Sequence, residues 1–132
     1  ERNNIQKVEL EHIDEAEKRI ERDRMLEIAA SQPKQFQATL YAILDVNSQK
    51  KNLIFAGEVY ESYKKICLQA GLRPLTQRRL SDIISELDML GVINAKIISK
   101  GRYGRTREIK VAIPKHTQKE VKKIIEGGLD LS

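Results

Sequence analysis

The chain has 132 residues, enough for one domain with a substantial core and an attached segment or two. Hydrophobic residues make up 40% and charged residues 33% of the sequence, which is typical of a soluble globular protein and argues against disorder. The apolar runs are short and the N-terminus has no signal-like apolar stretch, so we expect neither a membrane span nor secretion. The single cysteine, Cys67, cannot form an internal disulfide, and we expect a cytoplasmic protein.

Charge is distributed unevenly along the chain, whose net charge is +5. Residues 1–31 have a net charge of −3, and the rest of the chain has a net charge of +8. Residues 100–113 hold five basic residues and a single acidic one, Glu108. Positive charge concentrated in a short segment is the pattern expected for a polyanion partner, although solvated basic segments are common.

The first predicted element is a charged helix from about Leu10 to Ala30. Its apolar stripe is narrow, because it includes only Ile13, Ala16, Ile20 and residues 24–28. Such a stripe buries little, so we expect residues 1–31 to be a connector that continues from a preceding module. Pro33 interrupts this helix, and a second helix follows with Phe36, Leu40, Ile43 and Leu44 at helical spacing.

A turn, a short strand and two further helices are predicted next. Residues 47–52 are polar and turn-like, and residues 53–55 suit a very short strand. The third helix runs from about Gly57 to Ala70 and is closed by Gly71, since a left-handed glycine commonly ends a helix. The fourth helix is capped by Thr76 and stopped by Gly91. Its apolar residues follow a helical pattern: Leu80, Ile83, Ile84, Leu87 and Leu90.

A β-hairpin and a last helix complete the predicted order. Apolar residues alternate with polar ones in residues 93–97 and again in residues 108–113, and the two glycines in residues 100–105 suit a hairpin tip. The last helix is expected after Pro114, with Thr117 and Glu120 at capping-box spacing and Gly127-Gly128 as its end. The predicted fold is therefore mainly α with a small β-hairpin, in the order of a winged helix-turn-helix.

In a winged helix, the last helix of the trio places its N-terminal residues in the DNA major groove. Here those residues are Gln77, Arg78 and Arg79. Arginines in a first turn oppose the helix dipole at a cost of about 0.3–1 kcal/mol each. A nearby phosphate or guanine edge explains their presence, and simple solvation of both side chains is the alternative.

The hairpin tip offers a second set of candidates. Its arginines suit a narrow minor groove, and Tyr103 suits stacking against sugars. The alternative is an ordinary turn in which Tyr103 folds back onto the sheet. Basic residues at both the helix front and the tip favour DNA binding more than either does alone.

Three blocks of the sequence resemble the archaeal origin-recognition and cell-division-control replication initiators. The run LTQRRLSDIISELDMLG at residues 75–91 is similar to their recognition helix, and SKGRYGRTREI at residues 99–109 to their wing. Gly57-Glu58-Val59-Tyr60 with Tyr63, and residues 20–24, are similar to preceding segments of the same family. The resemblance covers about residues 8–113, and it departs from the family at Ala56, where we expect a hydroxyl residue that caps the third helix.

The resemblance implies an upstream AAA+ module that binds ATP and Mg²⁺, a winged-helix domain at residues 32–113, and a C-terminal helix and tail at 114–132. It implies that residues 1–31 leave the lid region of that module. The implied function is binding of double-stranded origin DNA by a monomeric fragment, with the replicative helicase or a sister initiator as a further partner. The predicted contacts are Thr76, Gln77, Arg78, Arg79, Ser81 and Ser85 on the helix, and Lys100, Arg102, Tyr103, Arg105 and Arg107 on the wing.

We expect no enzymatic activity, metal or cofactor in this segment. The sequence lacks a G-x-x-x-x-G-K-[ST] phosphate loop, and neither His12 nor His116 has a partner at zinc-ligand spacing. Cys67 lies on the apolar face of its helix and is expected in the core. Two alternatives to DNA binding by an initiator are a dimeric winged-helix transcription regulator and a winged helix that binds proteins through its terminal helices.

Overall fold

Five helices and a small three-stranded sheet make up the described part of the chain, residues 2–49, 53–99 and 105–131 of the computed structural model. This order confirms the predicted fold class, including the very short strand before the third helix. None of the described helices is long and apolar enough to cross a membrane. In chain order the elements are α1 (Arg2–Ser31), α2 (Lys34–Gln49), β1 (Ile54–Phe55), α3 (Ala56–Ala70), α4 (Gln77–Met89), β2 (Ile93–Ser99), β3 (Arg105–Val111) and α5 (Lys115–Leu129).

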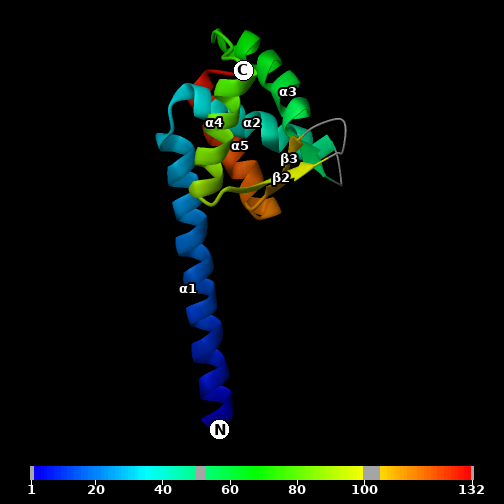
Figure 1. Ribbon diagram of the computed structural model, residues 1–132. Coiled ribbons are helices and arrows are strands. Elements are labelled where there is room, and N and C mark those ends of the chain that lie inside the picture. The colour runs from blue at the N-terminus through cyan, green and yellow to red at the C-terminus, as the bar shows by residue number, and fades with distance from the viewer. Residues whose placement is uncertain (1, 50–52, 100–104, 132) are drawn as a thin grey trace.

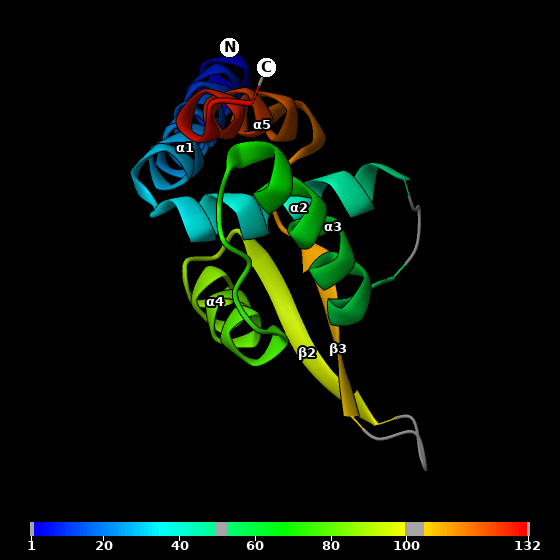
Figure 2. The same cartoon turned by 90° about the horizontal axis from the view of Figure 1, so that it is seen from above.

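The sheet is antiparallel with the order β1-β3-β2. Ile109 of β3 lies between Ile54 of β1 and Ala95 of β2, and both isoleucines are buried. The outer part of the hairpin leaves this core, because Ile97 is 59% exposed although it continues the apolar alternation of β2. Figure 2 shows α4 beside β2 and the hairpin extending past the helices.

The core forms around α2, which packs against α3, α4 and α5. Buried apolar side chains from all five helices and the sheet line it, and each fully buried valine, leucine or isoleucine contributes about 1.5–3 kcal/mol by burial. Helix α5 packs against α1 and α2 and buries Thr117, Val121, Ile125 and Leu129, one residue per turn. The C-terminal helix therefore shares one core with the winged helix.

Helix α1 projects from this core (Figure 1). Of its described side chains, residues 12–24 are all exposed, and burial begins at Met25 and Ala29. Arg22 donates to Glu120 of α5 at 2.6 Å, and Arg24 donates to the Leu90 carbonyl at 2.9 Å. The hydrogen bond and charge of Arg22 lower the pKa of Glu120. The thin stripe predicted for this helix thus packs only at its C-terminal end.

The ends of α3 and α4 follow the sequence signals. Gly71 closes α3 with φ +70°, and Gly91 follows α4 with φ +81°, both values that favour glycine. The Thr76 side chain caps α4 by accepting from the Arg79 amide at 3.2 Å. These boundaries confirm the predictions for both helices.

Four predictions about helix ends are wrong. Helix α2 continues to Gln49, into the expected turn. Helix α3 begins one residue earlier than expected, with Phe55 as N-cap and no side-chain cap, so Ala56 is its first residue and does not cap it.

The other two wrong predictions concern α5, which begins after Pro114 as predicted but has neither the capping box at Thr117 and Glu120 nor an end at Gly127-Gly128. Pro114 is the N-cap of α5, and Thr117 is a buried third-position residue whose hydroxyl has no hydrogen-bond partner among the described residues. Gly127 and Gly128 stay helical, and the chain turns at Asp130 with φ 58°.

Candidate nucleic-acid interface

The first turn of α4 presents an exposed cationic group. Thr76, Gln77, Arg78 and Arg79 are exposed, and the opposite side of the helix buries Leu80 and Ile84 in the core. Within the described residues, neither Arg78 nor Arg79 forms an ion pair or a hydrogen bond through its guanidinium. Two unneutralised guanidinium groups thus stand at a helix N-terminus, where the helix dipole favours anions.

Acidic side chains occupy the later turns of the same helix. Asp82 and Glu86 are exposed and Asp88 is half-buried. These carboxylates repel phosphate, so the part of α4 suited to a polyanion is its first turn. The surface of α4 therefore changes from basic in its first turn to acidic in its later turns.

The turn that leads into α4 is held through both backbone polar groups of one residue, Leu75. The Tyr63 hydroxyl accepts from the Leu75 amide at 2.8 Å and donates to Gln35 Oε1 at 2.5 Å. The Tyr60 hydroxyl donates to the Leu75 carbonyl at 3.1 Å, and Gln35 Nε2 donates to the Arg73 carbonyl at 3.0 Å. We call Gln35, Tyr60 and Tyr63 the turn clamp, because together they fix the residue before the Thr76 cap.

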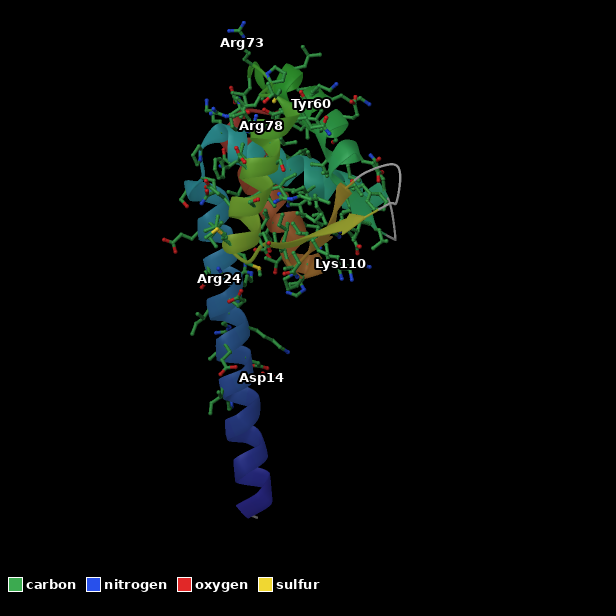
Figure 3. All side chains as sticks on the ribbon, viewed as in Figure 1. Asp14, Arg24, Tyr60, Arg73, Arg78 and Lys110 are labelled. Carbon is green, nitrogen blue, oxygen red and sulfur yellow. The ribbon has the colours of Figure 1, made fainter. Side chains whose placement is uncertain are left out.

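The turn clamp was not predicted as part of the site. Tyr63 is fully buried, and burial raises the pKa of its hydroxyl to about 12, which keeps it protonated and able to donate. The rings of Tyr60 and Tyr63 stack with centroids 6.0 Å apart. The only signal in the sequence is a pair of tyrosines three residues apart, in a helix that ends in a tight connection. Figure 3 shows Tyr60, Arg73 and Arg78 at the end of the domain away from Asp14 on the projecting helix.

Arg107 joins the hairpin to α4. Its Nη1 donates to the Ser81 carbonyl at 2.8 Å, and its Nη2 donates to Ser85 Oγ at 2.6 Å. Ser85 Oγ in turn donates to the Ser81 carbonyl at 3.2 Å. Three predicted site residues are thus brought together, and all three are half-buried. Both acceptors of Arg107 are neutral, and none of the ion pairs of the described residues includes Arg107.

A hollow of about 320 Å³ lies between the front of α4 and the hairpin. We call it the helix–wing hollow. Ile97 gives it an exposed apolar wall, the almost fully buried Leu80 and Ile84 lie at its base, and Gln77 and Ser81 give it polar walls. Its remaining described lining residues are Ala56, Thr106 and Arg107.

The tip of the hairpin lies outside this description. Lys100, Arg102 and Tyr103 are not among the described residues, and of Arg105 the structure gives only the backbone, paired with Ser99. Their contacts with DNA stay predictions.

The chain matches a known family over most of its length. The family model described as the CDC6 C-terminal winged-helix domain matches residues 27–121. An ORC1-type DNA replication protein of Pyrococcus horikoshii is 47% identical over 113 residues, which is 86% of this chain and 27% of the relative. The ORC1-type DNA replication protein 7 of Halobacterium salinarum is 42% identical over 132 residues, which is 100% of this chain and 25% of the relative. The chain spans about a quarter of the length of these curated relatives.

Solved structures agree with this match. The structure of the Aeropyrum pernix ORC1 protein in complex with DNA superposes with a TM-score of 0.78 at 35% identity, covering 89% of this chain and 30% of that chain. CDC6P from Pyrobaculum aerophilum has a TM-score of 0.66 at 19% identity over 80% of this chain and 26% of that chain, a likeness of fold alone. The chain therefore belongs to the CDC6 C-terminal winged-helix family.

Proposed function

We propose that this domain binds duplex DNA, with the first turn of α4 in the major groove and the β2–β3 hairpin at the adjacent minor groove, and so places a replication initiator on origin DNA. The observation that carries the proposal is the pair Arg78 and Arg79, exposed and without carboxylate partners in the described part of the chain. Arginine binds phosphate and guanine edges through a forked set of donors. The role is binding without catalysis, and ATP and Mg²⁺ belong to the rest of the parent protein.

Two further observations support it. The first turn of α4 is held by the Thr76 cap and the turn clamp, so the arginines are presented on a fixed backbone. The Aeropyrum pernix ORC1 protein, 35% identical to this chain, is described in complex with DNA.

The test is the salt dependence of duplex binding. Each phosphate neutralised by a cation contributes about 0.9 to the slope of log K against log salt. We expect Arg78→Gln and Arg79→Gln each to flatten the slope by about one and to weaken binding to all sequences. Arg19→Gln on the exposed part of α1 is the matched control and should keep the wild-type slope. Wild-type slopes in both α4 variants would remove this helix from the interface.

A second candidate function is contact with another protein through the projecting part of α1. The observation in its favour is that Ile13 and Ile20 are 56% and 69% exposed on that helix. The two isoleucines are seven residues apart, about two helical turns, so they lie on one side of the helix, and apolar groups gathered on one exposed face favour contact with a partner. Sedimentation of wild type and of the double variant Ile13→Glu/Ile20→Glu tests it, alone and with the replicative helicase or a sister initiator. Identical sedimentation of the two proteins in every mixture would exclude it.

A further inference from the structure

The helix–wing hollow has mixed walls that suit one strand of DNA. Ile97 is 59% exposed and lies beside Leu80 and Ile84, while Gln77 and Ser81 add an amide and a hydroxyl. Among the described lining residues there is no carboxylate. A sugar–phosphate strand has the matching chemistry, since apolar deoxyribose faces alternate along it with anionic oxygens.

The register of β2 and β3 places the guanidinium of Arg107 beside Ile97 in the wall of the helix–wing hollow. Ile97 is paired directly with Arg107, and directly opposed residues of an antiparallel pair share one face of the sheet. Arg107 is directed at α4, where the Ser81 carbonyl and Ser85 Oγ hold its two terminal nitrogens. Both acceptors are neutral, so the guanidinium is fixed in place and keeps its full charge. The same two hydrogen bonds tie β3 to α4 and set the width of the hollow.

The order of the grooves along duplex DNA determines how the domain lies on it. The major groove admits a helix and the minor groove is its neighbour. A domain with α4 in one and the hairpin at the other must straddle the single strand that separates them. We propose that the helix–wing hollow is the seat of that sugar–phosphate strand, with Ile97 against a deoxyribose and Arg107 as a fixed cation for the adjoining phosphate. The inference rests on the proposed DNA binding and adds to it a defined strand site.

The first experiment compares equal charge changes at two exposed aliphatic side chains. Ile97→Glu puts a carboxylate against the strand, and Leu68→Glu puts one on α3. Both side chains are more than half exposed, so neither change enters the core. We expect duplex affinity to fall by about tenfold or more in Ile97→Glu and by less than twofold in Leu68→Glu. Equal affinities in the two variants, with urea midpoints showing both folded, would overturn the strand site.

The second experiment separates the charge of Arg107 from its geometry. Arg107→Gln should flatten the salt slope by about one. Arg107→Lys keeps the charge but cannot reach both acceptors with a planar fork, so we expect about three- to tenfold weaker binding with the wild-type slope. A wild-type slope in Arg107→Gln would remove the cation from the site.

Duplexes with a single uncharged methylphosphonate, placed at each backbone position in turn, locate the phosphate. A methylphosphonate at one backbone position should lower the duplex affinity of the wild type. At the same position it should not lower the affinity of Arg107→Gln any further. Additive losses at every position would overturn the strand site. The salt slopes of the Arg78 and Arg79 variants test the proposed DNA binding independently of this hollow. Failure of the wild-type protein to bind duplex DNA would overturn both the proposed function and the strand site.

Discussion

Removing the Tyr63 hydroxyl tests whether the turn clamp fixes the start of α4. Tyr63→Phe leaves the ring in place and deletes one oxygen, which accepts from the Leu75 amide at 2.8 Å and donates to Gln35 at 2.5 Å. Each buried group left without a partner costs about 1–3 kcal/mol. Leu75 and Gln35 are half-buried and gain some water, so we expect a total loss of roughly 1–3 kcal/mol.

The assay is urea unfolding of wild type, Tyr63→Phe and the control Tyr60→Phe, followed by titration with duplex DNA. Tyr60→Phe removes a single bond, the 3.1 Å contact with the Leu75 carbonyl, and should cost about 0.5–1.5 kcal/mol. In DNA binding, Tyr63→Phe should lower affinity while keeping the salt slope, because no charge is lost and only the position of α4 changes. Stability of Tyr63→Phe within about 0.5 kcal/mol of wild type, or an unchanged DNA affinity, would refute the role given to the turn clamp.

Two further predictions concern stability. A Cβ at Gly128 would lie 2.8 Å from the amide of Gln37, which is buried and bonded to the Ala29 carbonyl, whereas a Cβ at Gly127 meets nothing within 4 Å. Gly127→Ala should therefore stabilise the protein by up to about 1 kcal/mol through helix propensity. The Gly128→Ala variant should be less stable than the Gly127→Ala variant by about 1–3 kcal/mol. Equal urea midpoints for the two variants would contradict this packing. Burial, with a hydrogen bond to Glu126, raises the pKa of Tyr41 to about 12 from an unfolded value near 10. The raised pKa of Tyr41 contributes its full stabilisation of the folded state below pH 10, and this stabilisation is lost as pH rises toward 12. The urea midpoint of Tyr41→Phe should therefore fall less than that of the wild type between pH 9 and 11.5. An equal fall in the two proteins would contradict the raised pKa.

The parts of the fold that local pattern determines were predicted. In α4 the apolar spacing, the Thr76 cap and Gly91 all indicate the same helix, and the structure has it. The arginines of α4 and β3 were likewise visible in the sequence, because cations at a helix front and in a wing are local features. What the sequence could not supply is their connection: Arg107 reaches Ser81 and Ser85, 26 and 22 residues away.

Helix α5 shows why the remaining predictions failed. Thr117 and Glu120 have capping-box spacing, but Thr117 continues the buried row that includes Val121 and Ile125, so packing places it inside the helix. Glu120 instead accepts from Arg22, 98 residues away. Gly128 was predicted to end the helix, yet its missing side chain makes room for Gln37. In each case a tertiary contact overrode a local signal.

The central claim is that the first turn of α4 and the hairpin face the same duplex. Mapping of backbone amide chemical shifts during titration with duplex DNA tests it most directly. We predict that the shifts concentrate at residues 76–81 and along β2 and β3, with little change in α1 and α5. Shifts confined to α1 and α5, with none at the start of α4, would contradict it.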